Sequence, residues 1–110
     1  MLVVAAPAAP SDVDTAKAKA AFQSAQQLYK QARYLDAVEK FEEAYRLKPH
    51  PSIFFNIGRC YEQLGEITRA LRSYRDYLKA LPDAKDKDTV AEAILNLERR
   101  MKETGLQQAA

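Results

Sequence analysis

The stretch FFNIGRCYEQLGEITRALRSYRDYLKALP, residues 54–82, decides the fold of this chain. Its apolar residues recur three and four positions apart, which is the spacing of one face of an α-helix. Gly65 interrupts this pattern, and a glycine there permits the tight turn that joins two helices. Pro82 ends the pattern. The stretch therefore predicts two helices over about 52–64 and 67–80, joined by a short turn.

The same helical spacing continues on both sides of this stretch. It predicts further helices over about 15–32, 35–48 and 87–103, which makes five helices and an all-α fold. The interior breaks fall at Pro49-His50-Pro51, at Gly65 and at Leu81-Pro82-Asp83. Ser11 or Asp14 is suited to cap the first helix, and Asp86 or Asp88 is suited to cap the last.

Composition limits the classes of protein that this chain can belong to. Its 110 residues suit one small domain, and a 47% hydrophobic composition with only 3 glycines is too apolar for a disordered chain and too poor in turns for a β-sandwich. Seventeen basic and 15 acidic residues leave a net charge of +2, which argues against a nucleic-acid partner. The sequence contains no apolar run of the length that a membrane-spanning helix needs.

The reactive residues do not form a catalytic or metal-binding pattern. The chain has one cysteine, Cys60, and one histidine, His50, so a cysteine cluster or a metal-binding histidine group is excluded. We expect Cys60 to be a buried thiol and His50 to be a solvated turn residue. No glycine-rich phosphate loop is present. The sequence therefore predicts no catalytic residue, no metal and no cofactor.

A shift of 33 residues aligns two helical hairpins. Phe22 falls on Phe55, Ala37 on Ala70, Phe41 on Tyr74 and Pro49 on Pro82. In the second helix of each hairpin, a small residue comes four positions before an aromatic one. A small residue lets two helix axes approach closely while the aromatic ring fills the space beside it.

At these residues the chain resembles the tetratricopeptide repeat family, whose unit is a 34-residue helix–turn–helix. The unit at 51–82 fits best, and the unit at 18–49 matches well in its second helix. Three residues depart from the pattern: Ala21 stands where a large aromatic is usual, Ser24 stands where leucine is usual, and Tyr77 replaces a small residue. The FFNIGRCYEQLG stretch is also similar to repeats of exported bacterial envelope proteins.

The resemblance implies a helical-repeat solenoid with a concave groove lined by the first helix of each hairpin. Such a groove holds a partner peptide or helix, so the expected function is that of a non-catalytic adaptor. The groove positions carried over from the family are Lys19, Phe22, Gln26, Tyr29 and Lys30 from the first hairpin, and Ser52, Phe55, Asn56, Arg59, Glu62 and Gln63 from the second.

Aromatic and basic residues at these positions favour a partner with apolar anchors and some acidic character. We expect Phe22 and Phe55 to lie along the concave wall, with Lys30 and Arg59 beside them. The alternative is that both phenylalanines pack between adjacent first helices as part of the core.

The fifth predicted helix carries an apolar stripe formed by Val90, Ile94, Leu97 and Met101. The stripe predicts a helix that caps the open end of the stack, since each hairpin buries its apolar face only against a neighbour. Tyr77 would then pack on this helix. In the alternative, Tyr77 and the stripe join two copies of the chain into a homodimer.

The two ends of the chain differ from its middle. Residues 1–14 form a disordered Ala/Pro-rich leader, residues 15–104 the helical domain and residues 105–110 a short disordered tail. Ala6-Pro7-Ala8 follows the small-x-small pattern of a signal-peptide cleavage site, which favours a periplasmic or exported protein over a cytoplasmic one. The leader lacks the positive charge that begins a signal peptide, so an ordinary disordered leader remains the alternative.

Overall fold

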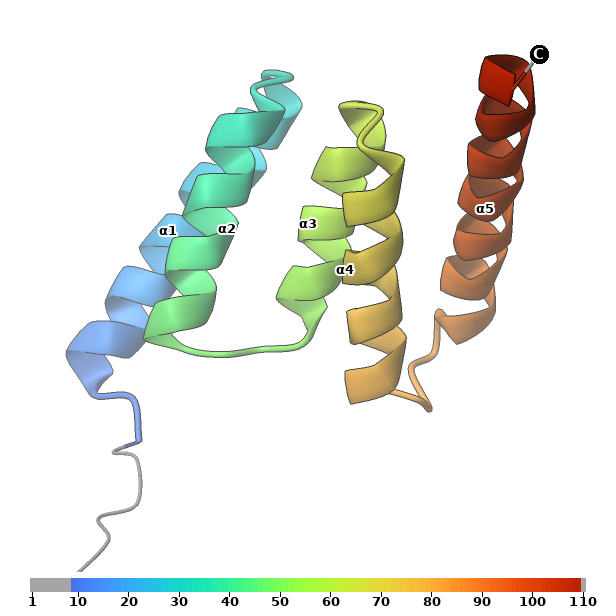
Figure 1. The fold of residues 1–110 in the computed structure, drawn as a ribbon. Coiled ribbons are helices and arrows are strands. Elements are labelled where there is room, and N and C mark those ends of the chain that lie inside the picture. Colours follow the sequence, from blue (N-terminus) through green and yellow to red (C-terminus); the bar gives the residue numbers. More distant parts are fainter. Residues whose placement is uncertain (1–8, 110) are drawn as a thin grey trace, which may run out of the picture.

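The computed structural model describes residues 9–109, with side chains described up to residue 105. Within this range the chain forms five α-helices and no strand, which confirms the predicted all-α helical repeat fold (Figure 1). The helices are α1 (Asp12–Lys30), α2 (Tyr34–Leu47), α3 (Ser52–Gln63), α4 (Ile67–Ala80) and α5 (Lys87–Ala109).

Two helix ends differ from the sequence-based bounds by three residues or more. Helix α1 begins at Asp12, because the hydroxyl of Ser11 accepts a hydrogen bond of 3.0 Å from the backbone N–H of Asp14 and so caps the helix. Helix α5 continues to Ala109 and so includes most of the segment that the sequence assigned to a disordered tail. The predicted leader at 1–14 overlaps the start of α1, and its residues 1–8 lie outside the described part of the chain.

The helices stack in chain order (Figure 1). Helices α1 and α2 form one antiparallel hairpin, α3 and α4 form the next, and α2 contacts α3 just as α4 contacts α5. The radius of gyration is 16.7 Å, whereas a compact chain of this length would have about 13 Å. The molecule is therefore elongated along the stack, as expected when each unit packs mainly on its neighbours.

Small residues bring the paired helices close together. In the first hairpin, Ala25 and Ala37 are completely buried beside Phe41. In the second hairpin, Gly58 lies so close to the ring of Tyr74 that a Cβ atom at Gly58 would be 2.8 Å from two ring carbons. These contacts are the physical basis of the repeated small-and-aromatic pattern in the sequence.

Both hairpin turns have the same backbone geometry. Ala32 and Gly65 adopt the left-handed conformation with φ of 60° and 73°. In each turn the next backbone N–H reaches back to the end of the preceding helix: Arg33 donates to the carbonyl of Leu28, and Glu66 donates to that of Tyr61, both at 2.9 Å. These bonds are typical of a Schellman helix end.

Helix α5 packs on α4 through Tyr77. This side chain is buried in one cluster with Val90, Ile94 and Leu97, and its hydroxyl donates a 2.7 Å hydrogen bond to Asp86. Tyr77 therefore contacts the last helix, as the sequence predicted. An ion pair of 2.7 Å between Arg75 and Glu98 joins the same two helices at the surface.

One departure from the family pattern in α1 lies in the core. Phe54 of α3 meets Tyr45 of the preceding helix at a ring distance of 5.0 Å. Its equivalent in α1 is Ala21, a small residue that is buried in the core cluster of the first hairpin. None of the helices in the described range is both long and apolar enough to cross a membrane.

Candidate protein-binding groove

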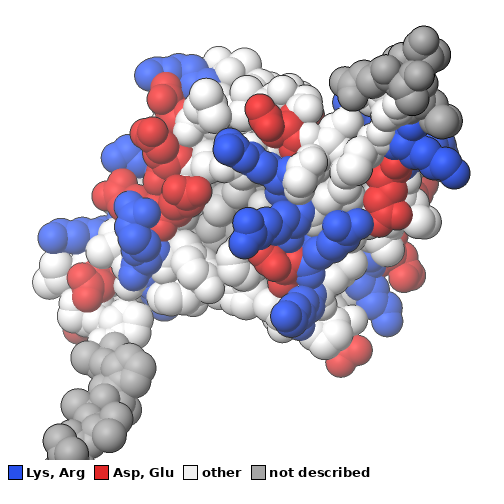
Figure 2. Space-filling model, viewed as in Figure 1, with Lys and Arg blue, Asp and Glu red and all other residues white. Residues whose placement is uncertain are grey.

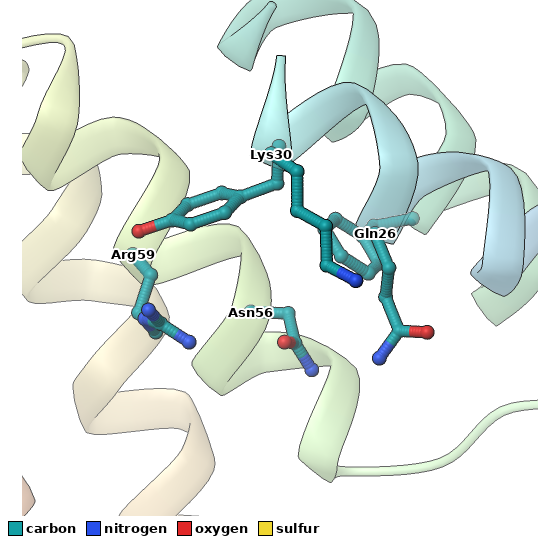
Figure 3. A pocket seen from close by; sticks show the side chains of 6 residues that line it. Gln26, Lys30, Asn56 and Arg59 are labelled. Atoms are coloured by element: carbon teal, nitrogen blue, oxygen red, sulfur yellow. The ribbon is translucent and has the colours of Figure 1, made fainter. Parts of the chain in front are cut away.

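A hollow of about 290 Å³ opens between α1 and α3 (Figure 3). Gln26 and Lys30 reach it from α1, and Asn56 and Arg59 reach it from α3. The spacing of these pairs, four residues on α1 and three on α3, places each pair on one face of its helix. Tyr29 and Phe41 complete the lining. Two amides and two cations thus share one cavity whose floor is aromatic.

Arg59 is held in place by aromatic rings and its side chain is exposed. Its guanidinium carbon lies 4.8 Å from the ring centre of Tyr29 and 5.9 Å from that of Phe55. Such cation–π contacts contribute about 0.5–1 kcal/mol at exposed sites and fix the position of the charge. Asn56 is also fixed, because its amide nitrogen donates a 3.0 Å hydrogen bond to the carbonyl of Ser52. Its carbonyl oxygen is left to accept from a ligand.

A second hollow of about 200 Å³ continues from the first and shares Tyr29 and Arg59 with it. Its lining adds Phe55, Glu62, Gln63 and Tyr74 from the second hairpin and Thr89, Val90 and Ala93 from α5. The hydroxyl of Tyr74 donates a 2.7 Å hydrogen bond to Glu62. Burial and this bond raise the pKa of Tyr74 well above its usual value, so the phenol remains a donor at neutral pH.

A third hollow of about 360 Å³ lies at the start of α1 and α3. Lys19 and Phe22 line it from α1, and Ser52 and Ile53 line it from α3. His50 lies in the turn before α3, where its Nδ1 accepts a 3.2 Å hydrogen bond from the backbone N–H of Ser52. The histidine thus satisfies a free amide at the start of α3. We call the three hollows together the groove.

Phe22 and Phe55 belong to both the groove and the core. Both are half-buried, and both line a hollow. Phe22 meets Phe41 edge-on at 5.4 Å between ring centres, and Phe55 lies 5.8 Å from Tyr74 and 5.6 Å from Tyr77. Each ring thus lies along the groove wall and also packs against an aromatic on the second helix of its own hairpin.

The structure gathers the remaining sequence-predicted groove residues into these hollows as well. Gln26, Tyr29, Lys30, Asn56 and Arg59 line the first, Glu62 and Gln63 line the second, and Lys19 lines the third. Thr89 and Ala93 were missed. Both are on α5, which the family pattern does not cover. Their four-residue spacing beside the Val90 and Ile94 stripe was the signal that could have pointed to them.

The residues of the alternative self-association surface lie mostly outside the groove, although Val90 also lines the second hollow. Tyr77, Val90, Ile94 and Leu97 are buried between α4 and α5, and only Met101 of this set is exposed, at 40%. Four of the five side chains therefore contact the chain itself and offer no free surface while α5 is in place.

Cys60 is a free and completely buried cysteine. Burial raises the pKa of its thiol to about 11, although the charge of Arg59 partly opposes this shift. The thiol is therefore protonated and unreactive at neutral pH. Within the described residues, no group of three histidine, cysteine, aspartate or glutamate side chains comes together to hold a metal ion.

Comparison with known families gives one match. A family model described as tetratricopeptide repeat matches residues 22–85, which is more than half of the chain. The matched segment includes both hairpins, apart from the first turns of α1. No curated protein matches the chain at a significant level.

Proposed function

Because this chain belongs to the tetratricopeptide repeat family, we propose that it is a non-catalytic adaptor that holds a segment of a partner protein in the groove. Repeats of this family mediate protein–protein interactions, and stacked repeats present extended concave surfaces for that purpose. The groove supplies such a surface, which runs along α1 and α3 and reaches α5.

The first hollow carries the proposal, because its side chains suit a peptide. The amides of Gln26 and Asn56 can donate to and accept from a peptide backbone. Lys30 and Arg59 add positive charge beside them. The half-buried rings of Phe22 and Phe55, one in each flanking hollow, offer contact to apolar side chains. The expected partner segment therefore combines apolar anchors with acidic residues.

The groove is built from helices, which lowers the cost of binding. Three of its lining side chains are held in place: Arg59 by a cation–π contact, Asn56 by its hydrogen bond to Ser52, and Phe22 by aromatic packing. A surface that is already ordered loses little conformational entropy when a ligand binds. A few well-placed contacts can therefore give useful affinity.

A displayed library of random peptides tests this proposal even though the partner protein is unidentified. Peptides selected on the wild-type chain would be synthesised and titrated by calorimetry against a double variant, Lys30→Glu with Arg59→Glu. Both substitutions change exposed side chains. We expect selected peptides to be rich in acidic and apolar residues and to bind the variant at least about tenfold more weakly, because two attractive charges become repulsive.

A matched control reverses two exposed lysines that line none of the three hollows of the groove, Lys17→Glu with Lys102→Glu. Its net charge equals that of the groove variant, so a general charge effect would weaken both proteins alike. Peptide affinity within about twofold of wild type is expected for the control. Equal affinity for wild type and the groove variant would refute the proposed site.

A further inference from the structure

The outer face of the stack carries opposite charges on its two second helices. At equivalent positions, 33 residues apart, three acidic residues of α2 correspond to three arginines of α4: Asp36 to Arg69, Glu39 to Arg72 and Glu42 to Arg75. We call the first set the acidic stripe and the second set the basic stripe. Figure 2 shows this face, with acidic side chains gathered over α2 and basic ones over α4, each among some charges of the other sign.

The spacing of three residues places each stripe along one side of its helix. The same hairpin geometry is repeated, so corresponding charges sit at corresponding heights along α2 and α4. Both helices lie on the near side of the molecule in Figure 1, in front of α1 and α3. The groove, between α1 and α3, does not include either stripe.

The charges of the stripes are accessible to a partner, although the guanidinium carbon of Arg69 lies 5.7 Å from the ring centre of Tyr61. Among the described residues Glu39, Glu42 and Arg72 take part in no ion pair, and all three side chains are exposed. Asp36 pairs with Arg33, and Arg75 pairs with Glu98, both at 2.7 Å. In both pairs about half of each side chain is accessible to solvent. Each ion pair is therefore weak, and its charged groups can also interact with a partner.

We propose that this outer face binds a second copy of the chain, with the acidic stripe of each copy against the basic stripe of the other. The occupant follows from charge complementarity, because one chain carries both halves of a self-complementary surface. A two-fold axis that runs between α2 and α4 and parallel to them places α2 of one copy on α4 of the other. The same operation aligns Asp36 with Arg69, Glu39 with Arg72 and Glu42 with Arg75. It also places Glu43 opposite Asp76 and Arg46 opposite Lys79, but α2 carries a net charge of −2 and α4 a net charge of +3, so the two helices still attract each other.

A second two-fold dimer could also bring the two outer faces together, but charge favours the arrangement described above. Turning the second copy about an axis across the helices would place α2 on α2 and α4 on α4. That arrangement faces acid with acid and arginine with arginine, which is repulsive. An interface in which each patch is used by both copies is the commonest form of homodimer.

The dimer leaves both grooves open on the sides that face away from the interface. Two grooves in one particle would bind a partner with two recognition segments more tightly than one groove alone. The contact is built from exposed charges, so we expect weak association that depends strongly on salt. This inference does not depend on the proposed peptide function, since the two surfaces are separate.

Analytical ultracentrifugation of charge-reversal variants tests the proposal. One variant carries Glu39→Lys with Glu42→Lys, and a second carries Arg69→Glu with Arg72→Glu; the Arg75–Glu98 pair is left intact in both. A control carries Glu92→Lys with Glu103→Lys, which are exposed on α5, and so matches the charge change of the first variant. Circular dichroism confirms that all proteins are folded.

We expect the wild type and the control to dimerise at low salt and to dissociate as the ionic strength rises to about 0.5 M. Each stripe variant alone should dimerise at least about tenfold more weakly, because like charges then face each other. An equimolar mixture of the two stripe variants should restore dimers, because the face of one variant is then mainly basic and the face of the other mainly acidic. A wild type that stays monomeric at low salt, or a dimer that persists in both stripe variants, would overturn the proposal.

Discussion

Ala32 and Gly65 occupy the same place in the two hairpin turns, and only the second turn has the residue that this conformation favours. Both have positive φ, and both precede the N–H group that closes the Schellman bond. The left-handed conformation costs a residue with a side chain about 1–2 kcal/mol, whereas glycine adopts it freely. Glycine marks the second turn in the sequence, whereas the left-handed residue of the first turn could not be identified there, because alanine gives no turn signal; that break was predicted from the helical spacing alone.

The substitution Ala32→Gly should therefore stabilise the protein. Glycine removes the strain of the left-handed conformation, and this gain is larger than the stability lost because glycine raises the entropy of the unfolded chain. We therefore expect the free energy of unfolding to increase by up to about 1 kcal/mol. Urea denaturation measures the change. Ala20→Gly is the control: it places glycine at an exposed position inside α1 and should destabilise by about 1 kcal/mol. A loss of stability in Ala32→Gly would contradict the assigned turn geometry.

Cys60 makes stability depend on pH. Its pKa is about 11 in the folded chain and has the ordinary value of 9.0 once the thiol is exposed, so the folded state holds the proton more tightly. The resulting stabilisation is complete below pH 9.0 and is lost as the pH rises towards 11. The Cys60→Ala variant should lack the part of the pH dependence of stability that comes from this thiol. The measurement is the difference in unfolding free energy between wild type and variant, under reducing conditions.

This difference should shrink between pH 9.0 and about pH 11. Tyr74 and Tyr77, whose pKa values are also raised, titrate in both proteins and cancel in the comparison. If the unfolding free energies of the two proteins changed in parallel with pH, the pKa of the buried thiol would not be raised as described.

At the scale of elements, helix α5 closes the second hairpin. Val90 and Leu97 are almost completely buried against α4, and Tyr77 fills the space between the two helices. The equivalent position in the first hairpin is Ala44, a small residue that lets two helices approach closely. The large tyrosine at position 77 prevents such an approach. Here the same bulk provides the surface on which the last helix packs.

The importance of this contact can be tested with two leucines of α5. Leu97→Ala should destabilise the protein by about 2–5 kcal/mol, because it leaves a cavity between α4 and α5. Leu95→Ala removes the same atoms from a side chain that is 60% exposed and should cost less than about 0.5 kcal/mol. Thermal or urea unfolding gives both values. Similar losses for the two variants would argue against a packed α5.

The elements were largely predictable from sequence because local signals mark them. Spacing of apolar residues identified every helix of the described range, and glycine or proline marked three of the four breaks between them. The end of α5 was placed too early because no glycine cap or proline stops it before Ala109: Gly105 is tolerated within the helix. The dual role of Phe22 and Phe55 also escaped the sequence, since spacing gives the face of a helix but not the depth of a ring between two helices.

At the scale of the whole molecule, the stack separates two surfaces. The groove combines amides, cations and aromatic rings, whereas the outer face carries the acidic and basic stripes. The groove residues could be placed from sequence through the repeat, because equivalent positions of α1 and α3 project from the same side of each hairpin. The part of the groove on α5 could not be placed in this way, because α5 lies beyond the matched family segment.

The most direct test of the adaptor function is an NMR map of where a selected peptide binds. Isotope-labelled chain would be titrated with the peptide of highest affinity, and the side-chain amide signals of Gln26 and Asn56 would be followed together with the backbone. We predict the largest shifts at these two amides and at Lys30 and Arg59. Shifts concentrated on the outer face of α2 and α4, with Gln26 and Asn56 unchanged, would contradict binding in the groove.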